Sequence, residues 1–296
     1  MSALDTAVPP PKVSSPKWEY FLILPGIISF LLLAVPQAGF VITSFYDDLG
    51  MGMVSEDAGL TNYLEIFTDP FYLSVVLRTL WLSLIATFIT LAMGFPTAYA
   101  LARMGRGWSI LILSLILTNS LVTDVIKLLG LTLVLSPSGF INQSLISVGL
   151  ISSPLTLINN EVGAVIGLVQ YTLPIAILIL CSVVQTIPIH LEEAGEILGA
   201  RRGVIFARVI VPLARYGLIS SGLLAFNMAM GAFTSPVLLG GGRVITMPVL
   251  IQQKIIQSTE YGMGAALSFV LLIVVFLINV LVGAFFLREV RRGGRA

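Results

Sequence analysis

Six long apolar runs, separated by polar intervals, dominate the pattern of this 296-residue chain. Each run is close to or longer than the roughly 20 residues that an α-helix needs to cross the hydrocarbon core of a bilayer. The pattern therefore predicts an all-α membrane protein whose six transmembrane helices lie within residues 20–288. The predicted spans are about 20–45, 74–102, 107–135, 161–186, 215–239 and 264–288.

Basic residues gather in every second polar interval. Together with the terminal segments 1–19 and 289–296, and with Arg215 and Arg288 at the adjoining span ends, these intervals hold 12 of the 16 lysines and arginines. Cytoplasmic segments of membrane proteins are enriched in Lys and Arg, so this side is predicted to be cytoplasmic and to carry both termini as tails. The longest interval on this side, the loop at 189–214, is then cytoplasmic too.

Composition and missing motifs exclude several classes of function. Hydrophobic residues make up 57% of the chain and charged residues 10%, with a mean hydropathy of +1.00. The net charge of +1 and the scattered basic residues give no nucleic-acid-binding face. We find no phosphate-binding G-x-x-x-x-G-K-[ST] loop, no His/Cys metal cluster around the single Cys181 and no catalytic carboxylate pair. The sequence predicts no catalytic residue, no metal site and no cofactor held by this chain, and any energy from ATP must come from a partner.

The cytoplasmic loop is the most informative polar interval. The apolar spacing at 191–198 predicts a short helix with glutamates in its first turns, and Gly199 would end it. A second helix is predicted over 204–211, closed by Pro212. An acidic helix, a glycine turn and a basic helix between two spans favour a docking element for another protein. An ordinary interhelical loop with capped helices remains the alternative.

This loop also carries a resemblance. Glu193, Ala194, Gly195, Gly199 and the run at 209–212 resemble the EAA signature of permease subunits of binding-protein-dependent ABC importers. The resemblance implies a type I ABC importer permease fold, in which the first loop helix docks into a groove of the ATPase. Gly195 replaces the usual alanine, which weakens the helix by about 1 kcal/mol. The residues implied in coupling to the ATPase are Glu192, Glu193, Ala194, Gly195, Gly199, Phe206 and Pro212.

Further segments resemble the spermidine/putrescine class of these permeases, and the long acidic segment after span one resembles the first of that class's two permease subunits. The segments include GFPTAYALAR before residue 104, SGFIN at 138–142 and FTSPVLLGGG before residue 243. The resemblance implies a multi-pass protein of the bacterial inner membrane that forms, with a second and different permease, the path for a polar, amine-containing solute. It also implies two ATPase subunits that bind ATP and Mg, and a periplasmic or extracellular solute-binding protein. Import of an opine, an aminoalkylphosphonate or another zwitterionic or anionic solute remains open, as does a secondary carrier or channel that ATP does not drive.

Polar residues inside the spans mark candidates for the path. Asp124 and Lys127 are three residues apart and share one helix face. Ionisable residues within a span are expensive in lipid, which favours a functional interpretation. Mutual neutralisation of the two side chains at the outer interface is the alternative. They lie where the spermidine/putrescine class often carries an Arg-Thr-Tyr-Ala-Trp run. The predicted lining residues are Asp124, Lys127, Tyr171, Asn227, Thr234 and Ser235.

An acidic segment at 47–77 follows the first span and contains no Lys or Arg. One interpretation is a surface that meets a binding protein or concentrates a cationic solute. The other is a solvated outer loop that membrane topology keeps free of basic residues. The six acids are Asp47, Asp48, Glu56, Asp57, Glu65 and Asp69.

Overall fold

The computed structural model describes residues 18–293, with side chains placed for 23–286. Most of the predicted N-terminal tail at 1–19 therefore lies outside the described residues. In the predicted C-terminal tail at 289–296, the residues up to Gly293 continue the last helix. The elements in order are α1 (Trp18–Thr43), β1 (Tyr46–Gly50), β2 (Met53–Ala58), α2 (Thr61–Thr68), α3 (Pro70–Arg103), α4 (Arg106–Leu121), α5 (Asp124–Leu135), α6 (Phe140–Ser147), α7 (Glu161–Gln185), α8 (His190–Ile197), α9 (Arg202–Ile205), η1 (Phe206–Ile210), α10 (Val211–Met230), α11 (Thr234–Leu238), α12 (Met247–Gln252), η2 (Gln253–Gln257) and α13 (Tyr261–Gly293).

Six segments of the described chain are long and apolar enough to cross a membrane, which confirms the predicted all-α, six-span class. They are Ile23–Thr43, Pro70–Arg103, Asp124–Ser147, Glu161–Gln185, Arg202–Met230 and Tyr261–Phe286.

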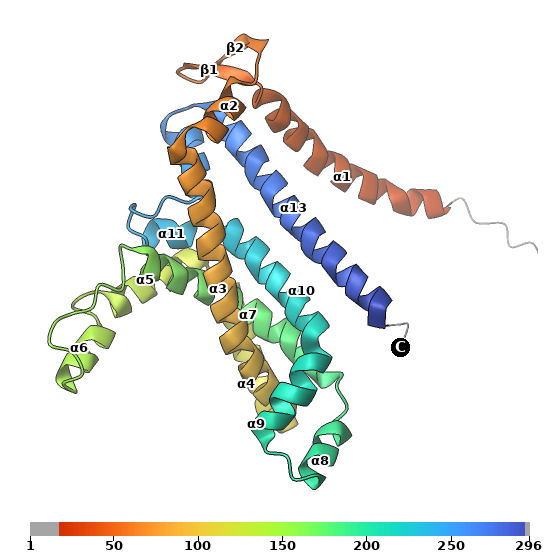
Figure 1. Cartoon of the computed structure of the whole chain (residues 1–296). Helices are drawn as coiled ribbons and strands as arrows, with labels where there is room; N and C mark the ends of the chain where they lie inside the picture. Colours follow the sequence, from red (N-terminus) through yellow and green to blue (C-terminus); the bar gives the residue numbers. More distant parts are fainter. Residues whose placement is uncertain (1–17, 294–296) are drawn as a thin grey trace, which may run out of the picture.

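The packed body of the protein is formed by α3, α7 and α10, which cross one another in Figure 1. Small residues permit the close approach, as at Gly217 of α10, where an added Cβ would lie 2.6 Å from side-chain atoms of Val183 in α7. The buried hydroxyls of Thr90 and Thr172 share a hydrogen bond of 2.7 Å between α3 and α7. Apolar packing and one internal polar pair therefore hold this body together without leaving either hydroxyl unpaired.

The helices α1 and α13 contribute little to this core. Within the span windows, 0% of α1 and 6% of α13 is buried inside the chain. Figure 1 shows α1 leaning away from the α3, α7 and α10 body, with α13 between them. Such helices, apolar on nearly all sides, need lipid or partner helices around them.

The predicted third span, 107–135, is wrong as a continuous helix, because the chain breaks between α4 and α5. Val122 and Thr123 have extended backbones at the break. The preceding turns are rich in hydroxyl and amide groups, and Thr118 and Ser120 hydrogen-bond back to the carbonyls of their own helix. Side chains of this kind compete with the helical backbone pattern and bend helices.

The predicted fifth span, 215–239, and the predicted helix at 204–211 are corrected together. One helical stretch runs from α9 through η1 into α10, so Pro212 does not end a helix. The wide turn of η1, in which Val211 N–H bonds to the Phe206 carbonyl, accommodates the proline in the first turn of α10. The stretch then ends at Gly231, and α11 is separate, because the ring of Pro236 would clash with the Ala232 carbonyl of a continuous helix.

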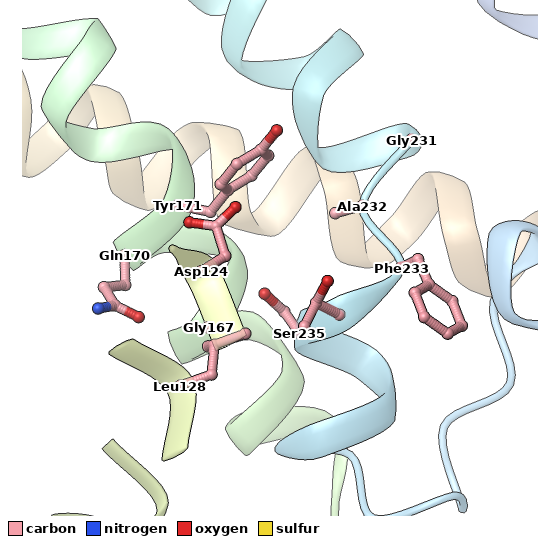
Figure 2. Close-up of a pocket in the computed structure, with 10 residues that line it drawn as sticks. Asp124, Leu128, Gly167, Gln170, Tyr171, Gly231, Ala232, Phe233 and Ser235 are labelled. Carbon is pink, nitrogen blue, oxygen red and sulfur yellow. The ribbon is translucent and has the colours of Figure 1, made fainter. Parts of the chain in front are cut away.

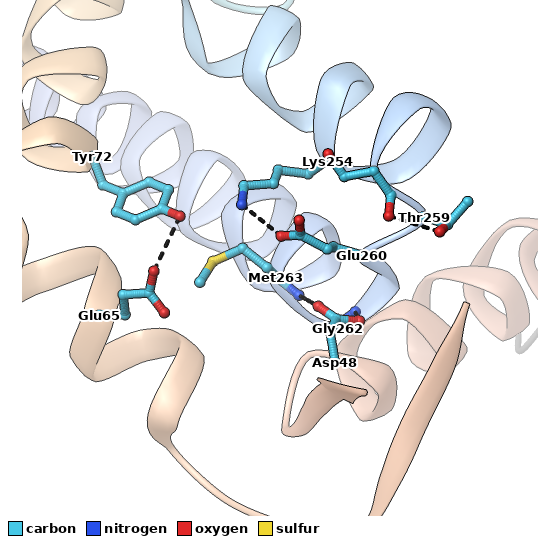
Figure 3. Close-up of polar contacts among 9 residues, drawn as sticks. Asp48, Glu65, Tyr72, Lys254, Thr259, Glu260, Gly262 and Met263 are labelled. Atoms are coloured by element: carbon cyan, nitrogen blue, oxygen red, sulfur yellow. Dashed lines mark hydrogen bonds and ion pairs between the residues drawn. The ribbon is translucent and has the colours of Figure 1, made fainter. Parts of the chain in front are cut away.

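The acidic segment folds into the β1–β2 hairpin and α2 at the end of the molecule opposite α8 (Figure 1). Several of its acids have partners within the chain. Asp48 accepts hydrogen bonds from the N–H groups of Gly262 and Met263, both at 2.8 Å, at the first turn of α13 (Figure 3). Asp69 caps α3, and Glu65 accepts a hydrogen bond of 3.2 Å from Tyr72.

The same end of the molecule holds a half-buried cation. Lys254 Nζ lies 2.5 Å from a carboxylate oxygen of Glu260 (Figure 3). Burial by itself would lower the pKa of Lys254, but the hydrogen bond to Glu260 and the neighbouring Tyr72 and Glu260 hold it above its ordinary value. In the acidic segment at 47–77, the contacts of Asp48, Glu65 and Asp69 serve the fold, whereas Glu56 and Asp57 remain exposed.

Replacing Asp48 by Ala is expected to loosen the hairpin from α13. The variant loses two hydrogen bonds to an ionised acceptor at a helix N-terminus, which together contribute about 2 kcal/mol at this half-buried position. At about 2–4 °C per kcal/mol, the melting temperature should fall by about 4–8 °C in detergent. Asp57→Ala is the matched control on the exposed side of the hairpin, and equal melting temperatures for the two variants would contradict this role.

Candidate functional site

The two broken helices meet at one pocket. Residues at the start of α5 and at the 231–233 break face the middle of α7 and line an open pocket of about 210 Å³ (Figure 2). Discontinuous helices at membrane depth place free backbone groups and polar side chains where a solute can reach them, and they are tolerated only in contact with protein or water. The lining residues are Asp124, Leu128, Gly167, Gln170, Tyr171, Gly231, Ala232, Phe233, Thr234 and Ser235.

Asp124 brings a charge to this pocket. It occupies the first turn of α5, where the positive end of the helix dipole favours a carboxylate. Its Oδ1 lies 2.7 Å from Lys127 Nζ, and the two side chains are 38% and 10% exposed. The predicted pair is therefore present, with the carboxylate toward the pocket and the ammonium buried.

The other polar groups at the pocket are neutral. Tyr171 and Gln170 come from consecutive positions of α7, and Thr234 and Ser235 come from the first turn of α11 (Figure 2). Gly167 lets α11 approach, because an added Cβ would lie 2.9 Å from both Ser235 and Leu239 side-chain atoms. One carboxylate with hydroxyl and amide groups around it suits a small polar, positively charged group.

The structure brings four of the predicted path residues to this pocket, namely Asp124, Tyr171, Thr234 and Ser235. Asn227 lies elsewhere: its amide exchanges two hydrogen bonds, of 3.0 and 2.9 Å, with Asn279 of α13. Its polarity is thus used in joining α10 to α13. Gln170 and Phe233 line the pocket without having been predicted, although the glycine and proline around 231–236 are a visible signal for the break beside Phe233.

The loop at 189–214 forms a second candidate site, at the end of the molecule opposite the β1–β2 hairpin (Figure 1). Its helix α8 ends in a Schellman motif, in which Ala200 N–H bonds to the Gly195 carbonyl and Gly199 N–H to the Glu196 carbonyl. Gly199 has φ +79°, and no atom lies within 4 Å of the position that a Cβ would take. A larger side chain would fit in the space at position 199, so it is the left-handed backbone conformation that requires glycine here.

Glu192 holds α8 to the end of α3. Its two carboxylate oxygens accept hydrogen bonds of 2.6 Å from Arg103 and Tyr99, and Arg103 also donates to the Ile187 carbonyl. The Arg103 and Glu192 side chains are only 17% and 13% exposed. Glu192 therefore points into the protein, whereas the neighbouring Glu193 is exposed.

Phe206 also points into the protein. Its ring packs against the rings of Phe95 and Tyr99 of α3, with centroid distances of 5.1 and 5.2 Å. Gly195 faces Ile205, where an added Cβ would lie 3.0 Å from the nearest side-chain atom. Together with Glu192, these contacts make α8, η1 and the end of α3 one connected unit.

The C-terminal end of α8 exposes apolar side chains next to the exposed Glu193 and Glu196. Ile197 and Leu198 are 86% and 87% exposed, and Ala194 on the same helix is exposed as well. Large apolar side chains that remain this exposed on a loop outside the apolar spans mark an interaction surface. The structure therefore presents, at one end, a face suited to docking.

Comparison with known proteins gives a consistent assignment. Residues 72–291 match the family model described as binding-protein-dependent transport system inner membrane component. The chain is 33% identical over 251 residues to the spermidine/putrescine transport system permease protein PotB of Haemophilus influenzae, covering 85% of this chain and 84% of that protein. It is 32% identical to PotB of Escherichia coli K12, covering 84% and 90%. Its fold is similar to a chain of a bacterial alginate ABC transporter that was solved in complex with an alginate pentasaccharide-bound periplasmic protein. The TM-score is 0.73 at 17% identity, and the match covers 89% of this chain and 92% of that chain.

Proposed function

Because the chain belongs to the family of binding-protein-dependent transport system inner membrane components, we propose that its pocket passes the solute and its loop receives the force of an ATPase. It is the permease subunit of an ABC importer for a polyamine-like solute. It is a multi-pass protein of the bacterial inner membrane and not an enzyme. The observation that carries the division of tasks is the meeting of two helix breaks at a polar pocket, far from an exposed apolar docking face.

The importer works with a periplasmic solute-binding protein as its partner. The remaining partners are part of the proposal: a second permease of different sequence and two ATPase subunits that hold ATP and Mg. The exposure of α1 and α13 supports a second permease, because these helices present more apolar surface than one chain buries. The open face of α8 supports docking of an ATPase, with the loop and both termini on the cytoplasmic side.

The contacts of the loop suggest how force reaches the pocket. A push on α8 is transmitted through Glu192 to Arg103 and Tyr99 at the end of α3, and through Phe206 into α10. Both α3 and α10 pack against α7, whose middle lines the pocket. Movement of these helices as rigid bodies would open the pocket alternately to the two sides.

This proposal predicts ATP-dependent uptake by a multi-subunit complex. The chain, expressed with the genes for its partner subunits and reconstituted in vesicles, should co-purify with an ATPase and a second permease. Uptake of labelled putrescine or spermidine should need ATP, the ATPase and the binding protein. The separate ATPase is needed because the chain has no phosphate-binding motif of its own. Uptake driven by an ion gradient without ATP would instead support the secondary-carrier alternative.

A further inference from the structure

The charged pair at the pocket is asymmetric. Lys127 is among the most buried charged side chains described, and it does not line the pocket, whereas Asp124 does. Asp124 is the one charged residue among the described lining residues. The pair as a whole is neutral, but a group inside the pocket meets its negative end first.

The partners of the two charges explain this arrangement. A buried ammonium needs a counter-ion, and Asp124 Oδ1 is 2.7 Å from Lys127 Nζ. The helical spacing of three residues fixes both side chains on one face of α5. Lys127 thereby holds one carboxylate oxygen in place. The other oxygen, Oδ2, has no hydrogen-bond partner in the described part of the chain, and it can therefore accept a hydrogen bond from a ligand.

The neutral groups around Asp124 fit an ammonium ion. Tyr171, which lies beside Asp124 in Figure 2, has an aromatic ring of the kind that binds cations. Gln170, Thr234 and Ser235 also line the pocket, and their side-chain oxygen atoms can accept hydrogen bonds. An anionic group would meet the carboxylate and no accessible cation among the described lining residues. The pocket therefore favours the ammonium end of a solute over a carboxylate or phosphonate end.

We propose that Asp124 binds an ammonium group of the solute in the pocket, and that Lys127 is the positioning residue that holds the Asp124 carboxylate toward it. The proposal rests on the proposed function, because it assigns a binding step within the same translocation path. It also changes the expectation for Lys127, which acts from behind the carboxylate and does not itself contact a solute.

The test compares charge variants in the reconstituted complex with loaded binding protein. The readout is labelled putrescine moved per ATP hydrolysed, because a loss of folding or assembly would lower uptake and hydrolysis together. Asp124→Asn should lower this ratio at least tenfold, and Asp124→Glu should restore part of it. Glu161→Gln is the matched control, since it removes a carboxylate from the exposed ion pair with Arg78 at 3.3 Å.

A double variant tests whether transport needs the carboxylate at the pocket or only an ion pair between positions 124 and 127. Asp124→Lys combined with Lys127→Asp keeps one ion pair and the same net charge, but it turns the ammonium toward the pocket. We expect the same loss of putrescine transport as in Asp124→Asn. Lys127→Arg should retain transport, whereas Lys127→Met should lower it, because the carboxylate is no longer held.

The outcomes separate this proposal from the proposed function. ATP-driven putrescine uptake that is unchanged in Asp124→Asn, or in the double variant, overturns the ammonium site and leaves the importer assignment intact. Uptake by the wild-type complex only of solutes without an amine overturns it as well. Absence of any ATP-driven uptake by the wild-type complex overturns both.

Discussion

Gly199→Val is expected to abolish transport while leaving the membrane-spanning body folded. A β-branched residue at φ +79° is strained by about 1–2 kcal/mol or more, although nothing in the structure would touch its Cβ. Relief of this strain opens the two hydrogen bonds that end α8 and turns the chain toward α9 differently. Because the docking face at Ile197 and Leu198 precedes this turn directly, ATP-driven uptake should fall at least tenfold.

A graded series tests the cause. Gly199→Asn should retain most of the uptake, because asparagine tolerates the left-handed region, and Gly199→Ala should fall between the asparagine and valine variants. Gly203→Ala is the matched control, since Gly203 lies in α9, has no positive φ and has open space around it. Co-purification of the ATPase should follow the same order. Equal uptake by the asparagine and valine variants would show that the backbone conformation of Gly199 is not what docking requires.

The local pattern of the loop was enough to predict its first helix and the end of that helix. Glutamates in the opening turns, apolar residues at helical spacing and a following glycine all act within eight residues, and α8 ends with Gly199 in the expected left-handed conformation. The prediction for Pro212 was wrong because the outcome depends on a wider helical turn. That turn is set where Phe206 packs against α3, which is a contact between distant parts of the chain.

The candidate pocket was also predictable only where local sequence signals mark it. Glycine, proline and hydroxyl groups near 231–236 indicated an irregular helix, and the structure has a break there. The break between α4 and α5 has no proline or glycine, and hydropathy alone favours an unbroken span across it. Sequence spacing placed Asp124 and Lys127 on one face, but only tertiary packing decides that the carboxylate lines the pocket and the ammonium does not.

Polarity alone also does not say which way a side chain points. Asn227 was predicted to line the path, yet its amide is used by Asn279 of α13. Glu192 and Glu193 are neighbours with the same chemistry, and only one of them faces α3. In both cases the partner lies more than 50 positions away, so no local pattern contains it.

Glu192→Ala is expected to separate ATP hydrolysis from transport. The variant leaves the Arg103 guanidinium without its carboxylate and Tyr99 without its acceptor, at a site where both charged side chains are largely buried. Removing one partner of a buried pair costs about 3–5 kcal/mol, and the remaining solvent exposure here places the loss near 3 kcal/mol. The helix α8 should then move without carrying α3 with it, so the ATPase still docks while solute moved per ATP falls at least tenfold.

The matched control is one helical turn away. Glu196 pairs with Arg202 at 3.3 Å, but these side chains are 52% and 90% exposed, so Glu196→Ala should cost no more than about 0.5 kcal/mol. Amide hydrogen exchange over 190–197 measures the difference directly, because about 3 kcal/mol corresponds to roughly a 100-fold faster exchange when α8 opens by itself. Equal exchange in the two variants would mean that packing of Phe206, and not the Glu192 pair, fastens the loop to α3. A large increase in Glu192→Ala alone, together with the loss of coupling, would identify the carboxylate as the link between the docking face and the membrane helices.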